Sequence, residues 1–171
     1  DMVRKQALDW AELFWKNRWT DLSIVDRKKL AATGDWETAL ELAAKEPVML
    51  YYRAAEMANQ QKFDDAAQAA AKFREIAQAA TEDKAGHLYN AACAYGLCAA
   101  AVQPAEGEAL TEEEQTRRKG YLGLSLACLK EAVAGGYEDR EHARKDPDLA
   151  VLRDLPEFQK LVKTPPDEDS N

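Results

Sequence analysis

The sequence lacks any run of about 18 apolar residues, and no stretch alternates apolar and polar residues for long. The first absence excludes a membrane-spanning helix, and the second excludes a sheet with one buried face. Glycine is also scarce, at 8 of 171 residues, whereas alanine dominates the apolar share. Alanine loses no side-chain entropy in a helix and lets helices approach closely. The composition therefore predicts an all-α protein.

Basic residues are in the minority, with 23 Lys and Arg against 31 Asp and Glu, so the formal net charge is −8. A nucleic-acid partner requires a basic surface, so we expect none. Three cysteines, an odd number in a helical chain, favour a reduced, cytoplasmic protein. We expect no cofactor and no membrane insertion.

The apolar spacing predicts a series of helices in a single domain that covers residues 1–163. Within it we distinguish N-terminal helices (1–33), the clearest repeats (34–134) and a C-terminal cap (135–163), followed by a disordered acidic tail (164–171). The expected helices are residues 3–18, 20–33, a short one from 35 to before 47, 47–60, 63–80, 81–102, 111–134, and two short ones starting near 146 and 156. Residues 103–110 contain Pro104 and Gly107 and predict a loop.

Helix ends are marked by particular residues. Thr111 followed by Glu114 is a capping box, and Thr81 is the expected cap of the preceding helix. Gly135 and the glycine after it end the long helix, which leaves His142 in a loop. The cap is expected to cover the last open face of the array with regularly spaced apolar residues: Leu149, Leu152, Leu155, Phe158 and Leu161.

An internal repeat is visible in the sequence. Residues 34–39 (GDWETA) have the Gly-Asp-aromatic pattern of an inter-helix turn, and residues 63–67 (FDDAA) are a second copy. A third copy begins at residues 88–95 (LYNAACAY). Small residues at these places let two helices cross closely. Arg27 departs from the pattern, because the first copy needs a small residue there.

These motifs resemble the tetratricopeptide repeat (TPR). Residues 89–100, 129–137 and 146–161 are similar to the C-terminal TPR region of large bacterial serine/threonine protein kinases. The resemblance implies a right-handed stack of antiparallel helix pairs, about three repeats plus capping helices. It also implies a non-catalytic scaffold that binds a protein or peptide within a larger signalling protein. The alternatives are a structural spacer or oligomerisation module, and an enzyme with an unrecognised site.

The residue types that carry chemistry form no catalytic or metal site that the sequence supports. Cys93 and Cys98 are five positions apart, so on a helix they point about 140° from each other. Cys128 is distant in sequence, and packed, free thiols are the expectation for all three. His87 and His142 each lack a second ligand at metal-binding spacing.

The TPR resemblance places a peptide-binding groove on the first helix of each repeat. The residues expected there are Tyr51, Ala55, Asn59, Tyr89, Asn90 and Leu97. No cation matches the clamp that some TPR domains use for a carboxylate, so we expect an apolar anchor stacked on the two tyrosines. In the alternative interpretation both tyrosines fill the helix interface. Trp15 and Trp19 lie off the apolar stripe of the first helix and form a possible docking surface.

Overall fold

The computed structural model describes residues 47–163, and within this range every regular element is a helix. The long helices are α4 (Val48–Asn59), α5 (Phe63–Ala79), α6 (Lys84–Ala101) and α7 (Glu112–Ala134). Three short elements follow: α8 (Arg140–Lys145), the 3₁₀ helix η2 (Pro147–Leu152) and α9 (Pro156–Leu161). The all-α prediction is confirmed for this part of the chain. The helices expected before residue 47, Trp15, Trp19 and the tail lie outside the described residues.

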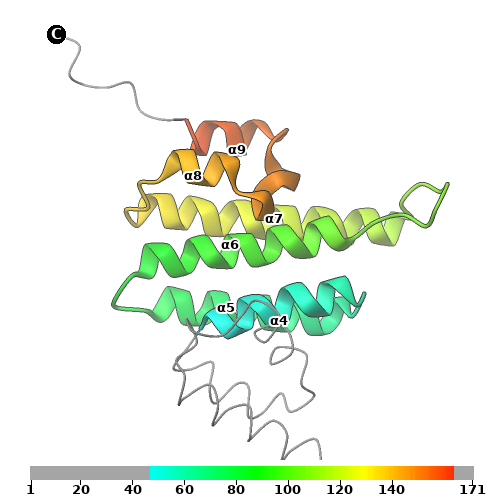
Figure 1. Ribbon diagram of the computed structural model, residues 1–171, viewed down its shortest axis with the longest axis horizontal. Helices are drawn as coiled ribbons and strands as arrows, with labels where there is room; N and C mark the ends of the chain where they lie inside the picture. The colour runs from blue at the N-terminus through cyan, green and yellow to red at the C-terminus, as the bar shows by residue number, and fades with distance from the viewer. Residues whose placement is uncertain (1–46, 164–171) are drawn as a thin grey trace, which may run out of the picture.

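The long helices form two antiparallel pairs stacked in layers (Figure 1). The pair α4–α5 lies on one side of α6, and α7 runs back along α6 on another side. The short elements cover the opposite end of the stack, where η2 contacts α6 and α9 contacts α7. None of the described helices combines the length and apolarity that a membrane crossing requires.

Helix α6 is the centre of the core, because it contacts α4, α5, α7 and η2. Ten of its 18 residues are buried, among them four alanines, two tyrosines and two cysteines. A helix that is apolar on all sides is typical of a protein interior. The three described thiols are free and buried, as predicted.

The capping box predicted at the start of α7 is present. The Thr111 hydroxyl accepts from the backbone N–H of Glu114 at 3.2 Å, and the Glu114 carboxylate accepts from the Thr111 N–H at 2.7 Å. The cap predicted at Thr81 is wrong. Helix α6 begins at Lys84 because the backbone of Asp83 is left-handed (φ 46°), which a right-handed helix cannot contain.

The segment around His142 also differs from the prediction of a loop. Residues Arg140–Lys145 form α8, and the Asp139 carboxylate caps it by accepting from the His142 N–H at 2.8 Å. The apolar residues expected in the lid are buried or partly buried. Leu149, Leu152 and Phe158 are at most 1% exposed, and Leu155 and Leu161 are partly buried against the core.

Candidate functional site

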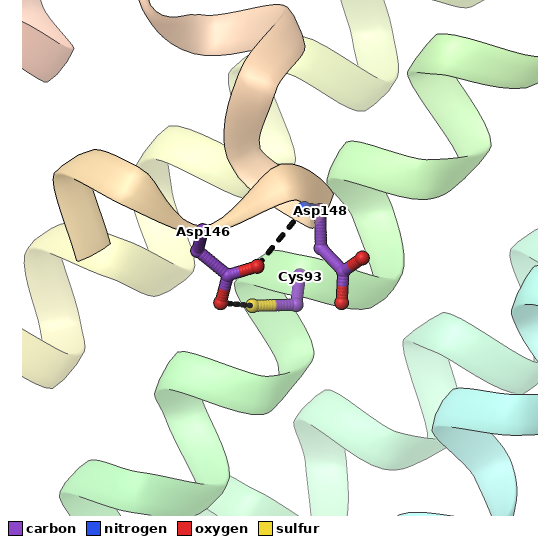
Figure 2. Close-up of side chains that lie close together, drawn as sticks. All are labelled: Cys93, Asp146 and Asp148. Carbon is purple, nitrogen blue, oxygen red and sulfur yellow. Dashed lines mark hydrogen bonds between the residues drawn. The ribbon is translucent and has the colours of Figure 1, made fainter. Parts of the chain in front are cut away.

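Two aspartates at the start of η2 face the tyrosines of the long helices. The Tyr89 hydroxyl of α6 donates to Asp146 Oδ2 at 2.5 Å, and the Tyr51 hydroxyl of α4 donates to Asp148 Oδ2. The Cys93 thiol lies 3.7 Å from the same Asp146 oxygen. Figure 2 shows Asp146 and Asp148 directed from the start of η2 toward Cys93 on α6. We call these five residues the aspartate clasp.

Local chemistry places the first aspartate. The other oxygen of Asp146, Oδ1, accepts from the Asp148 N–H at 2.9 Å and so caps η2. Pro147, the first residue of η2, has no N–H to satisfy. One carboxylate therefore both starts the 3₁₀ helix and joins it to Tyr89.

Close approach of η2 to α6 depends on Gly96. A Cβ atom there would lie 2.4 Å from the carbonyl oxygen of Asp148, closer than any real contact. Tyr89, Cys93 and Gly96 are spaced four and three residues apart, so they share one face of α6. Tyr137 stacks on Tyr89 with ring centroids 4.2 Å apart, which links this face to the segment after α7.

Burial keeps the clasp donors protonated. It raises the pKa of the Tyr51 and Tyr89 hydroxyls and of the Cys93 thiol far above their ordinary values, and the two nearby carboxylates add to the shift at Cys93. Burial also raises the pKa of Asp148, against the lowering effect of the Tyr51 hydrogen bond. On the outer side of the clasp, His142 Nε2 lies 3.4 Å from Asp146 Oδ2 and forms an ion pair with it when the imidazole is protonated.

The clasp includes a possible set of metal ligands. One ligand atom each from Cys93, Asp146 and Asp148 lie within 4.8 Å of one another. Sulfur and two carboxylates suit a borderline cation such as zinc. However, tyrosine hydroxyls already donate to both carboxylates, and the thiol lies 3.7 Å from one of them. The arrangement is complete as a hydrogen-bonded clasp without an ion.

The predicted groove residues divide into two groups. Tyr51 and Tyr89 come together in the clasp, the first half-buried and the second 5% exposed. The other four lie on the same two helices but outside the clasp: Ala55, Asn59, Asn90 and Leu97. Asn59 is exposed and the remaining three are half-buried. Their role in binding a peptide stays a prediction.

Sequence reasoning missed Asp146 and Asp148 as site residues. It interpreted Asp146 and Pro147 only as the start of a helix. The available signal was the pair of acidic residues around a proline, directly before a leucine that the cap needs to bury. When the neighbouring leucine is buried, the adjacent carboxylates are drawn toward the interior. A buried carboxylate needs a hydrogen-bond donor there.

A second polar region lies at the turn between α4 and α5. It is an open pocket of about 370 Å³ whose lining includes Lys62, Asp64 and Arg117. Arg117 pairs with Glu113 at 2.7 Å and lies over the Phe63 ring at 4.9 Å. The arginine charge is thus already engaged within the chain.

Comparison with known proteins gives no relative. No family model matches this chain, nor does any curated protein or solved structure. The function must therefore be inferred from the arrangement of the residues themselves.

Proposed function

We propose that this chain is a TPR-like module that binds other proteins and belongs to a larger bacterial signalling protein such as a serine/threonine kinase. The observation that carries the proposal is the repeated helix pair. Helix α6 packs against both α4 and α5, and α7 then packs antiparallel to α6. Stacked helix pairs of this kind offer extended faces that suit protein partners.

Small residues where the helices of a pair cross support the same proposal. Ala54 on α4 and Ala66 and Ala70 on α5 are fully buried. In the next pair the Ser125 hydroxyl of α7 donates to the Ala92 carbonyl of α6 at 2.7 Å, so the two backbones lie close together. The spacing of small residues that defines the sequence repeat thus coincides with the close contacts of the structure.

The surface chemistry favours a protein or peptide as the partner. A net charge of −8 repels the phosphate backbone of a nucleic acid. A cysteine-dependent enzyme has less support, because burial raises the pKa of each described thiol and so disfavours the thiolate that such a nucleophile needs.

A structural spacer is the second candidate, and one observation favours it. Both tyrosines expected to stack on a ligand donate their hydroxyls to aspartates of the same chain. In this alternative the two tyrosines only hold the C-terminal cap against α4 and α6, and the face formed by these two helices binds no partner.

Site-specific photocrosslinking separates the two functions. A photoreactive amino acid is placed at Asn59 or Leu97, on the predicted groove helices, and at Gln68 on α5 as the matched control. The scaffold predicts that the first two positions crosslink the same protein in a bacterial extract and that Gln68 does not. The purified protein must then bind the module directly. Equal crosslinking from all three positions, or none from any, would support the spacer.

A further inference from the structure

The face of α6 that carries Tyr89, Cys93 and Gly96 already holds the first turn of the 3₁₀ helix η2, which belongs to the same chain. Residues 146–149 lie on this face, and Asp148 reaches across to Tyr51 on α4. Two of the six residues expected in the peptide groove, Tyr51 and Tyr89, are therefore engaged by the module's own cap.

The contacts of residues 146–149 show which chemical groups this face of α6 binds. Two carboxylates accept from two tyrosine hydroxyls, which fixes acidic residues at the first and third positions of the segment. The carbonyl group of the third position presses against Gly96, where only a glycine leaves space. The next residue, Leu149, is fully buried. The occupant is an Asp-Pro-Asp-Leu segment in a 3₁₀ turn that its own first aspartate caps.

We propose that this face is a receptor for acidic Asp-Pro-Asp-Leu segments, that the cap fills it in the resting protein, and that a partner carrying such a segment binds by displacing the cap. This inference rests on the proposed scaffold function and specifies both its ligand and its regulation. The cap acts as a built-in competitor, since a short tether holds it at an effective concentration in the millimolar range.

The connection between α7 and the cap permits displacement. Gly135 and Gly136 are exposed, and Gly136 has a φ of +101°, which glycine adopts without strain. The cap consists of three elements of six residues each. Helices this short depend on their contacts with the rest of the protein, so the cap is the part expected to open first.

The buried leucines oppose displacement and determine how the resting state behaves. Leu149 and Leu152 are 0% exposed, and Phe158 is 1% exposed. Their burial and the tether together favour the filled face. Wild-type protein is therefore expected to bind a competing segment weakly, and a protein with a loosened cap is expected to bind it well.

The test uses a fluorescein-labelled peptide with the sequence of residues 140–163 and measures fluorescence anisotropy with the full chain. The Leu149→Ala protein has a weakened cap, and we expect it to bind the peptide at least tenfold more tightly than wild type. Leu124→Ala is the matched control, because this half-buried leucine lies on α7 outside the cap. It should bind as wild type does.

A second peptide tests the carboxylates without changing the protein. With alanine at both aspartate positions, the peptide leaves the two tyrosine hydroxyls without acceptors, so its affinity for the Leu149→Ala protein should fall at least tenfold. If Leu149→Ala fails to fold by circular dichroism, Leu155→Ala replaces it, since Leu155 is only partly buried.

Two results would overturn the inference. One is a folded variant that binds the peptide no better than wild type, and the other is equal binding of the aspartate and alanine peptides. Neither result affects the photocrosslinking test. A protein that crosslinks a partner at Asn59 but does not bind the acidic peptide would still be a scaffold, and it would bind its partner through other residues.

Discussion

Most helices after the loop at residues 103–110 begin differently from the described helices before it. Helices α4, α5 and α6 have no side-chain hydrogen bond at their N-termini. By contrast, Thr111, Asp139 and Asp146 supply one at the starts of α7, α8 and η2. Among the described elements after the loop, α9 is the exception, because Leu155 supplies no such bond.

The number of buried residues accounts for this contrast in the most buried helix and in two of the least buried ones. Helix α6 buries ten of its 18 residues, so packing stabilises it without a cap. Helix α8 buries one residue and η2 buries two, and each has a side-chain hydrogen bond at its first turn. Helix α9 also buries one residue but lacks such a bond, and the proline in its first turn leaves one fewer N–H to satisfy. The interior of the array is held by apolar packing, whereas the cap is held by a few apolar anchors together with polar contacts of specific geometry.

The largest effect is expected from removal of the cap. Deletion of residues 138–171 uncovers the face of α6 and α7 on which Leu149, Leu152 and Phe158 pack. Each of these side chains contributes about 1.5–3 kcal/mol by burial. We expect an aggregating or molten chain in size-exclusion chromatography and near-ultraviolet circular dichroism. A monomeric truncation that melts at the temperature of the full chain would show that the array needs no cap.

Two helical glycines sharpen the comparison. At Gly96 an added Cβ meets the Asp148 carbonyl, whereas at Gly123 on α7 it meets nothing within 4 Å. Gly96→Ala should destabilise by about 1–3 kcal/mol through overpacking against the cap. Gly123→Ala should stabilise by about 0.5–1 kcal/mol, because alanine restricts the unfolded chain. Urea denaturation measures both, and equal effects would mean that the cap does not press on Gly96.

Loss of the capping box should have a smaller effect. Thr111→Ala removes the acceptor for the Glu114 N–H, so the free energy of unfolding should fall by about 1 kcal/mol. Thr111→Ser keeps the hydroxyl and serves as the control. The same denaturation experiment applies, and a Thr111→Ala protein as stable as wild type would indicate that packing alone holds α7.

The smallest effect concerns the charge of Asp148. Burial raises the pKa of Asp148 in the folded state above its unfolded value of about 3.9. At a pH between these two pKa values, the native protein binds more protons than the unfolded chain does. This group therefore makes stability fall as the pH rises through that window. Asp148→Asn removes the penalty, so the melting temperature of the variant relative to wild type should rise with pH and level off above the window. A difference independent of pH would contradict the raised pKa.

The long helices were predictable because their signals are local. The bounds of α4 and α5 lie within one residue of the prediction, and the box at Thr111 and Glu114 spans only four positions. The start of α6 was not predictable in this way. Thr81 is a good cap by residue type, but the left-handed turn at Asp83 follows it and forces the helix to begin later.

The clasp was out of reach for a different reason. Its hydrogen bonds join residues 97 and 57 positions apart, and no local spacing records such a pairing. Tyr51 and Tyr89 were placed in the groove by resemblance to a repeat, which describes the long helices but not the segment that crosses them. The aspartates therefore entered the sequence analysis only as part of a helix start.

The burial of the three thiols provides the molecule with internal probes of its own opening. Burial raises the pKa of Cys98 and Cys128 to about 12 and raises that of Cys93 as well, and all three thiols are at most 3% exposed, so we expect alkylating reagents to react slowly with them in the closed state. Cys93 lies beneath the cap, whereas Cys98 and Cys128 are fully buried in the core around α6 and α7. Under pulsed alkylation, modification of Cys93 alone would therefore record opening of the cap, and modification of all three together would record unfolding of the whole array.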